Sequence, residues 1–412
     1  MDNVLTKSTV VPYLRAHENI MLNDPVTVNE IGDGSLGADV EGDGCCNYVF
    51  RVSDGEHSYI VKQSTGSTKK SGMLVPADRN QFEYEIMKIR ADIVPQYVPK
   101  VYFTDPERNL YVMEDVSYLK LIRFQLAKNH IYPNLPSMIA EYLAATHFYT
   151  SEFYMDAADY RKQMAHFMNP DERVVCEDDV FLKIFGADDY DPACGEKFRE
   201  YCENIRKNPN LQFQRFKLRH LFQSKSECLI HGDFHTSNIF ADDSHMKVID
   251  MEYTFGAPFS YDLGFFISNI ITQYSSAVFR PFDLEDDRKR YTAYLLSVIE
   301  MLYTQYIKYF MGYWDKDAKP VYQRTPCYKE VLALDILHEV FGFAACYNFA
   351  RVRGTMATVE FDSIEDNTLR TKAKYLSIDI DKLLFEKWSS YDNVKDIISD
   401  IIAVTKRRLN TL

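Results

Sequence analysis

The stretch HGDFHTSNIF occupies residues 231–240, and the stretch VIDMEY follows at residues 248–253. They contain an aspartate, Asp233, then an asparagine five residues later, Asn238, and a second aspartate twelve residues after that, Asp250. Single Asp and Asn residues are common in turns. A set with this spacing, in which the last aspartate follows an apolar segment, is far more specific and indicates a catalytic loop.

These residue types suit the transfer of a phosphoryl group. Such a reaction needs a carboxylate that orients the acceptor hydroxyl and takes its proton, and Asp233 can fill that role. It also needs Mg²⁺, which prefers hard oxygen ligands, and such oxygens are offered by Asn238, Asp250 and Glu252. Because residues i and i+2 of an extended segment point the same way, we expect Asp250 and Glu252 to face one metal site.

Zinc-dependent hydrolysis is a competing interpretation of the same loop. His231 and His235 are four residues apart and could share one face of a helix. Gly232, however, stands where a zinc protease carries its general-base glutamate, and a glycine also disfavours the helix. We therefore expect His231 to brace the backbone of the loop and His235 to orient or pack.

The first part of the chain has the signals of strands and turns. Apolar and β-branched runs predict strands at residues 26–31, 47–52, 58–63, 98–103 and 110–114. Asp54-Gly55 predicts a hairpin turn, and apolar residues at helical spacing predict a helix over residues 79–91. After Asp115 the segments become long, aromatic-rich and helical in period, as at residues 136–148, 290–310 and 331–352.

Three features of this first part suit nucleotide binding. Gly42 and Gly44 lie in a loop whose glycines let backbone N–H groups approach a phosphate. Lys62 follows on a strand, and Glu83 on the next helix can pair with it and hold it against the phosphates. Glu85, two residues farther round the helix, should then point away. Each feature has an alternative interpretation. Gly-Asp-Gly also forms ordinary turns, and a lysine on a strand is often only a surface residue. A second Gly-Asp-Gly copy upstream could be the phosphate loop instead.

The order of these elements predicts the fold class. A glycine loop, a strand lysine, a helix glutamate and the spaced Asp, Asn and Asp follow one another as in protein-kinase-like folds. We expect an α+β, bilobal fold. Its small antiparallel-sheet N-lobe would cover residues 1–115 and bind nucleotide, and its larger helical C-lobe would cover residues 116–412 and carry the catalytic loop and the acceptor site.

The composition argues against several other classes. The chain has 412 residues, 46% of them hydrophobic and 26% charged, which suits a folded globular protein. A net charge of −13 argues against nucleic acid as the main partner, since phosphate binding needs a basic face. We expect no membrane segment, because no run approaches the roughly 20 apolar residues that a membrane helix needs. The eight scattered cysteines predict free thiols in a cytoplasmic protein.

Most of the chain resembles the 5-methylthioribose kinase family, within the aminoglycoside-phosphotransferase and choline-kinase branch of kinase-like folds. The resemblance is carried by HGDFHTSNIF together with EIGDG or EGDG before NYVFRV, IVKQ at residues 60–63, VPKVYFTD at 98–105, VMEDVSYLK at 112–120, FMNPDERVV at 167–175 and VIDMEYTFGAPFSYDLGFFISN at 248–269.

The resemblance implies that ATP binds between the lobes with Mg²⁺ and that its γ-phosphate passes to the 1-hydroxyl of 5-methylthioribose, a sugar of methionine salvage. ATP would contact Gly42, Gly44, Asn47, Lys62, Glu83 and the hinge residues Met113, Glu114 and Asp115. Mg²⁺ would be held by Asn238, Asp250 and Glu252. The sugar would be held by Asp233, which is also the base, and by Arg351. Members of the family are typically homodimers.

Departures from the family pattern keep other acceptors open. Asn238 stands where the family usually has a small residue such as serine, and residues 72–79, GMLVPADR, lack the tryptophan of the loop that covers the sugar. Only Arg351 remains of a pair of adjacent arginines, because the preceding residue is Ala350. A kinase of the same fold that acts on another sugar, choline or an aminoglycoside is therefore an alternative. A nucleotide-binding pseudokinase is a further one, although the complete set of Asp and Asn residues argues against it.

Overall fold

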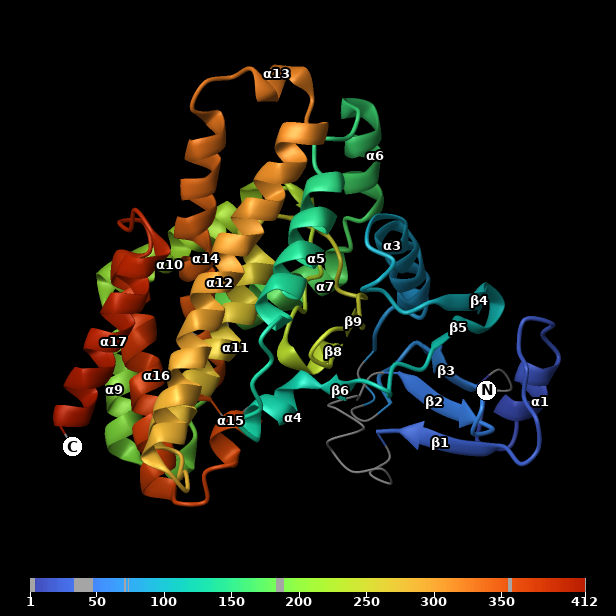
Figure 1. The fold of residues 1–412 in the computed structure, drawn as a ribbon, viewed down its shortest axis with the longest axis horizontal. Helices are drawn as coiled ribbons and strands as arrows, with labels where there is room; N and C mark the ends of the chain where they lie inside the picture. The colour runs from blue at the N-terminus through green and yellow to red at the C-terminus, as the bar shows by residue number, and fades with distance from the viewer. Residues whose placement is uncertain are drawn as a thin grey trace. The chain divides into compact units, whose positions relative to one another are not determined.

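The computed structural model describes residues 4–32, 47–69, 72, 74–182, 189–354 and 358–411. The chain divides into two compact units, whose elements are labelled in Figure 1. The first unit comprises Met1–Phe124 and Thr236–Thr254, and the second comprises Gln125–His235 and Phe255–Leu412. The division of the functional lobes after Asp115 remains a prediction.

A five-stranded antiparallel sheet forms the centre of the first unit. Its strands are ordered β1-β2-β3-β5-β4 and comprise β1 (Thr27–Ile31), β2 (Tyr48–Ser53), β3 (Ser58–Gln63), β4 (Val101–Asp105) and β5 (Leu110–Glu114). The turn between β2 and β3 contains Gly55, whose φ of 91° is a backbone conformation that glycine adopts without strain. The Asp54 carboxylate stabilises this turn by accepting hydrogen bonds from the backbone N–H groups of Glu56 and His57. The predicted hairpin is thus confirmed.

The core of the first unit joins the sheet to the N-terminal segment, which includes α1 (Val10–Arg15). Its buried members are Leu5, Val10, Leu14, Ile20, Phe50, Val52, Tyr59, Val61, Leu110 and Val112. Alternate residues of β2 and of β5 contribute, as expected of strands that bury one face against a core. Burial of these apolar side chains stabilises the sheet on which Lys62 is placed.

A second, smaller sheet of the first unit contains the two strands that follow the catalytic loop. It is antiparallel, in the order β6-β8-β9, with β6 (Lys120–Leu121), β8 (Ile239–Ala241) and β9 (Met246–Val248). Other elements of this part are α3 (Arg79–Ile93), the 3-10 turns η1 (Pro106–Arg108) and η4 (Thr236–Asn238), and α4 (Ile122–Ala127), which spans the boundary of the units. The N–H of Val248 donates to the carbonyl oxygen of Tyr97 at 2.9 Å, which fixes the end of β9 just before Asp250.

The second unit is mainly helical. Its long helices are α5 (Leu135–Tyr149), α10 (Pro209–Ser224), α11 (Ser260–Phe279), α12 (Glu285–Asp317), α14 (Tyr328–Arg353), α16 (Asn367–Lys387) and α17 (Val394–Asn410). Shorter elements are α6 (Ala157–His166), α7 (Pro170–Glu177), η2 (Asp178–Leu182), η3 (Pro192–Cys194), α9 (Glu196–Arg206), α13 (Pro320–Gln323), α15 (Val359–Asp362) and the paired strands β7 (Cys228–Leu229) and β10 (Gly256–Ala257). The three helical segments predicted after Asp115 fall within α5, α12 and α14.

Helix α11 is the central helix of the second unit. It is buried along its whole length and packs against α14, α12 and α16, which lie beside it in Figure 1. Gly264 permits the close approach of α11 and α14, because a Cβ atom there would lie 2.7 Å from the carbonyl oxygen of Val340. The helix therefore offers a fixed support for the loop that precedes it.

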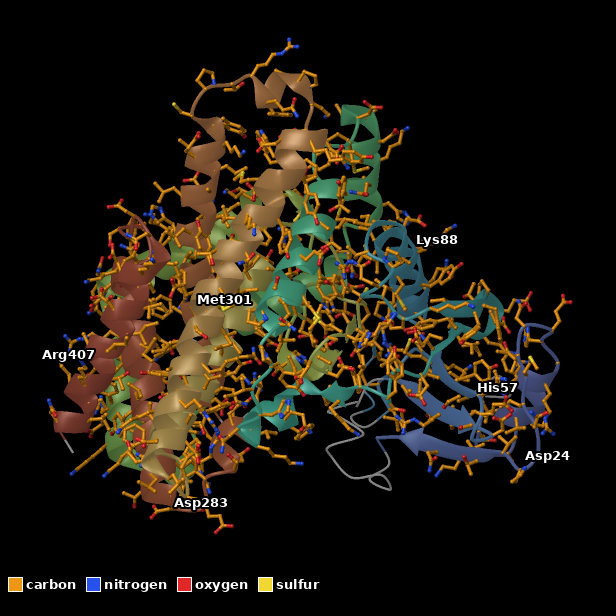
Figure 2. All side chains as sticks on the ribbon, in the orientation of Figure 1. Asp24, His57, Lys88, Asp283, Met301 and Arg407 are labelled. Atoms are coloured by element: carbon orange, nitrogen blue, oxygen red, sulfur yellow. The ribbon has the colours of Figure 1, made fainter. Side chains whose placement is uncertain are left out.

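Many charged side chains of the second unit are exposed. Asp283 and Arg407, for example, are exposed and extend away from the ribbon in Figure 2. Among the described residues, no helix combines the length and the apolar character that a membrane crossing requires. The six cysteines in the described part of the chain are all free, as predicted.

Candidate active site

Lys62 and Glu83 form a buried ion pair in the first unit. Lys62 lies on β3 opposite Tyr111 of β5, and its Nζ is 2.7 Å from Oε2 of Glu83 on α3. The two side chains are 7% and 1% exposed. The predicted contact is thus present, and Glu85 instead accepts a hydrogen bond from Gln81 on its own helix. The role of the pair in holding phosphates remains a prediction.

The charge of Lys62 is set by burial and by its neighbours. Burial alone lowers the pKa of Lys62, but the carboxylates of Asp250 and Glu83 raise it well above its ordinary value. Burial raises the pKa of Glu83, and the charge of Lys62 offsets part of that rise. The Lys62 Nζ also contacts the carboxylate of Asp250. A lysine held charged among carboxylates is suited to bind phosphate oxygens.

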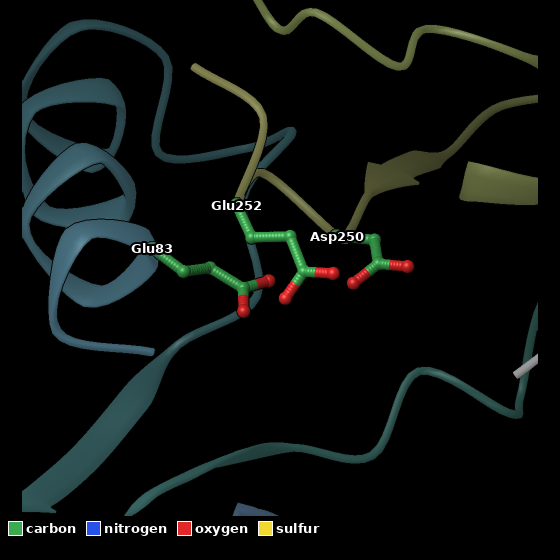
Figure 3. Close-up of side chains that lie close together, drawn as sticks. All are labelled: Glu83, Asp250 and Glu252. Atoms are coloured by element: carbon green, nitrogen blue, oxygen red, sulfur yellow. The ribbon is translucent and has the colours of Figure 1, made fainter. Parts of the chain in front are cut away.

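Three carboxylates gather beside Lys62. One oxygen each from Glu83, Asp250 and Glu252 lie within 4.8 Å of one another, and Figure 3 shows the three groups side by side. Glu83 comes from α3, and the other two come from the loop after β9. Carboxylate oxygens are the ligands that Mg²⁺ prefers, so this set fits a divalent cation. Sequence reasoning expected Asp250 and Glu252 to meet, but it assigned Glu83 to Lys62 and to ATP and not to the metal.

The backbone at Asp250 differs from the extended segment that was expected. β9 ends at Val248, and Asp250 has a φ of 64°, in the left-handed region that aspartate tolerates better than most residues. Glu252 lies in the turn that follows, and the N–H of Met251 donates to Oε1 of Glu83 at 3.1 Å. The argument from an extended strand was therefore wrong. The two carboxylates meet because the chain turns sharply here.

Asn238, the remaining predicted metal ligand, is buried at the end of η4. Its backbone carbonyl accepts a hydrogen bond of 3.0 Å from the N–H of Ile249. This bond ties the end of the catalytic loop to the residue just before Asp250. The assignment of its side chain to Mg²⁺ remains a prediction.

A buried arginine that sequence reasoning missed supports Glu252. Arg79, at the first position of α3, is 4% exposed, and its Nε donates to Oε2 of Glu252 at 3.2 Å. Its Nη2 donates to Oδ1 of Asn47 at 2.5 Å, and Nδ2 of Asn47 donates to the same Glu252 oxygen at 3.2 Å. Asn47, predicted to contact ATP, is thus bonded to a candidate metal ligand. The only signal in the sequence was an arginine that begins the helix carrying Glu83.

The predicted hinge residues lie at the end of β5. Met113 is buried on that strand. Glu114 accepts a hydrogen bond of 3.0 Å from the backbone N–H of Lys100, and Oδ2 of Asp115 lies 3.1 Å from Nε of Arg51. The two carboxylates therefore hold neighbouring segments of the same unit in place. A contact of these hinge residues with adenine remains a prediction.

The predicted phosphate loop falls in a part of the chain that the structure leaves undescribed. Gly42 and Gly44 both lie outside the described residues. Of the competing upstream copy only Gly32 is described, with a φ of 86°. The choice between the two copies therefore remains a prediction.

Asp233, the predicted base, lies in the second unit beside His235. Nε2 of His235 is 3.2 Å from the Asp233 carboxylate, and the two side chains are 23% and 30% exposed. The backbone N–H of Asp233 donates to Nδ1 of His231, which is fully buried. Residues 231–235 form a loop, so the two histidines do not share a helix face as the zinc-protease motif would require. Both histidines contact Asp233, and their supporting role remains a prediction.

A second residue that sequence reasoning missed anchors this loop. Asp262, wholly buried on α11, accepts the backbone N–H groups of His231 at 2.6 Å and of Gly232 at 3.1 Å. Nε2 of His147 lies 3.4 Å from the same carboxylate. Burial by itself raises the pKa of Asp262, but His147 and His231 lower it below its ordinary value. A charged carboxylate therefore fixes the backbone immediately before Asp233.

Arg351, predicted to bind substrate, is largely buried on α14. Its Nη1 donates to Oδ1 of Asn269 at 3.0 Å, and its Nη2 lies 3.8 Å from Oε2 of Glu360. Arg353, two residues on, is buried with its guanidinium over the ring of Tyr190. The two arginines thus face different surroundings, as expected. The role of Arg351 toward substrate remains a prediction.

Comparison with known proteins identifies the family of this chain. Residues 42–291 match the sequence model of the phosphotransferase enzyme family. The chain belongs to this family. A methylthioribose kinase of Bacillus cereus (strain G9842) is 32% identical over 387 residues, which cover 93% of this chain and 92% of the relative. A methylthioribose kinase of Bacillus anthracis is 31% identical with the same coverage.

Membership of the phosphotransferase enzyme family identifies the chain as an enzyme that transfers phosphoryl groups and implies ATP as the donor. Together with the antiparallel sheet and the helical unit, it confirms the predicted α+β, kinase-like fold class. The crystal structure of a choline kinase from Cryptosporidium parvum Iowa II covers 98% of this chain and 97% of its own, at 11% identity and a TM-score of 0.45.

Proposed function

We propose that this chain transfers the γ-phosphate of ATP to the 1-hydroxyl of 5-methylthioribose in a Mg²⁺-dependent reaction of methionine salvage. The observation that carries the proposal is the near full-length likeness to methylthioribose kinases, at 31–32% identity over 93% of the chain. The charged cluster around Lys62 supports the phosphotransfer part of the proposal independently of that likeness.

On the donor side, Lys62 would bind the phosphates of ATP, and Glu83 would keep its ammonium group in place. Asp250 and Glu252, together with Asn238, would hold Mg²⁺, which when bound neutralises charge on the phosphate oxygens. The fit rests on carboxylate oxygens within 4.8 Å of one another, the hard donors that this ion takes. Adenine would lie against the hinge residues named above.

On the acceptor side, Asp233 would orient the 1-hydroxyl and take its proton as the new oxygen–phosphorus bond forms and ADP leaves. His235, 3.2 Å away, would hold this carboxylate in place, and Asp262 would hold the backbone of the loop. Arg351 would contact the sugar or the transferred phosphate. Asp233 would then release this proton to solvent, which regenerates the carboxylate for the next turnover.

The assembly and the compartment are proposed on the family likeness alone. We expect a homodimer in the cytoplasm, as typical members of the family are. Size-exclusion chromatography with light scattering tests the assembly, and a monomer at micromolar concentration would refute it.

Another acceptor is the second candidate function, and specific residues favour it. Residues 72–79 lack the tryptophan of the loop that covers the sugar in the family, and Ala350 replaces one of two arginines. Both changes concern the acceptor and leave the donor residues intact. An enzyme with this donor machinery could therefore phosphorylate a different sugar, choline or an aminoglycoside.

An acceptor screen read by ADP release tests the proposal. 5-Methylthioribose, ribose, choline and kanamycin are compared at equal concentration with ATP and Mg²⁺. We expect kcat/KM for 5-methylthioribose to exceed that for the others by about 100-fold or more, since buried polar groups of a sugar site reject analogues that leave them unpaired. Preference for another acceptor would favour the second candidate, and nucleotide binding without any turnover would favour a pseudokinase.

The matched controls for this screen are two aspartate variants. Asp233→Asn should lower kcat by about 10²–10⁴-fold, the usual contribution of a general base. Asp242→Asn should leave kcat unchanged, although Asp242 also pairs with a histidine, His245, at 3.1 Å on an exposed turn. Equal losses in the two variants would remove the assignment of Asp233.

A further inference from the structure

The guanidinium of Arg79 is held in place by backbone groups as well as by Glu252. Its Nη1 donates to the carbonyl oxygens of Thr65 and Pro76, each at 3.3 Å. Its Nε and Nη2 donate to Glu252 and Asn47, which lie 173 and 32 residues away in the sequence. With a side chain only 4% exposed, Arg79 has little freedom to follow a moving partner. It is a fixed support for the groups that it touches.

The side chain of Glu252 accepts hydrogen bonds from Arg79 and from Asn47, and both bonds are made to the same oxygen. Nε of Arg79 and Nδ2 of Asn47 each lie 3.2 Å from Oε2 of Glu252, and a third bond between Arg79 and Asn47 closes the triangle. A carboxylate oxygen that already accepts two such bonds is poorly available to a metal ion. The planar fork of an arginine fixes the orientation of the carboxylate as well as its position.

The charges of the cluster divide between two buried cations. Lys62 contacts Glu83 and Asp250, and Arg79 contacts Glu252. Each carboxylate of the set therefore has a cationic partner in this structure, although the three lie within 4.8 Å of one another. Lys62 is the residue expected to meet phosphate, and Arg79 is the cation in direct contact with Glu252.

We propose that Arg79 is a positioning residue that restricts Glu252 to a single coordinating oxygen and thereby favours Mg²⁺ over Ca²⁺. Mg²⁺ requires near-ideal octahedral geometry, to which a carboxylate contributes one oxygen, whereas Ca²⁺ accepts more ligands and often binds a carboxylate through both oxygens. Because Oε2 accepts hydrogen bonds from Arg79 and Asn47, coordination of the ion by Glu252 would use Oε1. The inference rests on the metal site of the proposed function and adds the selection of the ion.

Competition for bound Mn²⁺ tests this role without relying on activity. Mn²⁺ bound to the protein with a non-hydrolysable ATP analogue is displaced by Mg²⁺ or by Ca²⁺, and free Mn²⁺ is counted by electron paramagnetic resonance. The measured quantity is the ratio of the Mg²⁺ concentration to the Ca²⁺ concentration that each displace half of the bound Mn²⁺. The nucleotide contributes equally in every variant, so a change in the ratio reports the protein ligands.

Arg79→Met should shift this ratio toward Ca²⁺ by about tenfold, because Glu252 can then coordinate through both oxygens. Arg79→Lys should shift it in the same direction, since lysine keeps the charge but cannot hold both Glu252 and Asn47. The lysine variant also preserves the test if the methionine variant fails to fold. Arg90→Met, which removes another buried arginine from α3, should leave the ratio unchanged.

Three other outcomes would overturn this inference, and the first two separate it from the proposed function. An unchanged ratio in both Arg79 variants, with Mn²⁺ still bound, would overturn the role of Arg79 and leave the metal assignment standing. Absence of Mn²⁺ binding to the wild-type complex would overturn the metal assignment and this inference together. An equal shift in Arg90→Met would show a general effect of losing a buried charge and would also overturn the role.

Discussion

The carboxylate of Asp262 on α11 accepts a hydrogen bond of 2.6 Å from the backbone N–H of His231, two residues before Asp233. A second bond to the N–H of Gly232 makes the contact bidentate. Because α11 is buried along its length, this contact attaches the loop to a helix inside the core of the second unit. The position of the proposed base thus depends on a residue that never needs to touch substrate.

We predict that Asp262→Asn lowers both stability and kcat. The amide presents an NH₂ group where a backbone N–H now points, so one hydrogen bond is lost at a cost of about 1–3 kcal/mol in the free energy of unfolding. The KM for ATP should change little, because ATP is assigned to the other unit. Urea unfolding and steady-state kinetics check this, with Asp283→Asn, an exposed aspartate, as control. A variant with normal stability and normal kcat would show that the bond is dispensable.

Replacement of Lys62 by Met should reduce kcat/KM for ATP by about 10²–10³-fold, the usual loss when one electrostatic contact to a reacting group is removed. Glu83→Gln should give a smaller loss, since the lysine would remain but would be held less firmly. Initial rates at varied ATP concentration measure both. If the two variants kept the wild-type kcat/KM, the buried pair would be structural only.

Asp250→Ala should abolish the gain in nucleotide affinity that Mg²⁺ provides. Calorimetry with a non-hydrolysable ATP analogue, with and without Mg²⁺, measures that gain directly. Asp242→Ala, in the exposed turn between β8 and β9, is the matched control and should retain it. An equal effect of Mg²⁺ in the wild type and in Asp250→Ala would remove Asp250 from the metal site.

The stability of the protein should fall with rising pH through the titration of Asp381. Burial raises the pKa of this carboxyl group well above its ordinary value, and Asn348 donates a hydrogen bond of 2.8 Å to its Oδ1. Because the folded state binds the proton more tightly than the unfolded state, stability is lost as pH rises from the unfolded pKa, about 3.9, through the folded pKa.

Asp381→Asn should therefore be more stable than the wild type at pH 8, because the amide resembles the protonated acid. The difference should shrink as the pH is lowered toward 4. Urea unfolding at several pH values measures it, with the exposed Asp392→Asn as control. A difference that stays constant with pH would mean that Asp381 does not titrate in this way.

Much of the fold follows from local signals in the sequence. The strands over residues 58–63 and 110–114 are placed as predicted, and the turn at Asp54-Gly55 has the glycine conformation that its sequence implies. β4 begins at Val101, three residues later than predicted. Pro99 supplies the physical reason, because it lacks an N–H for the ladder and restricts Val98 before it.

The residues of the candidate site could be predicted where a spaced motif in the sequence indicates their chemical role. They could not be predicted where the site depends on contacts between residues far apart in the sequence. Lys62, Glu83, Asp250 and Glu252 could be named from their order along the chain. Arg79 could not, because its partner Glu252 is 173 residues away and a single arginine carries no pattern. The same is true of Asp262, whose function depends on backbone N–H groups that any residue could supply. The sharp turn at Asp250 was missed because an aspartate in a left-handed conformation looks like any other aspartate in a sequence.

The most direct measurement is ³¹P NMR of the reaction of ATP with 5-methylthioribose. We predict a new sugar phosphate signal that couples to the anomeric proton and forms in equal amount with ADP. The signal should disappear in Asp233→Asn and persist in Asp242→Asn. Formation of ADP without a sugar phosphate, or a phosphate on any hydroxyl other than that at carbon 1, would contradict the proposed reaction.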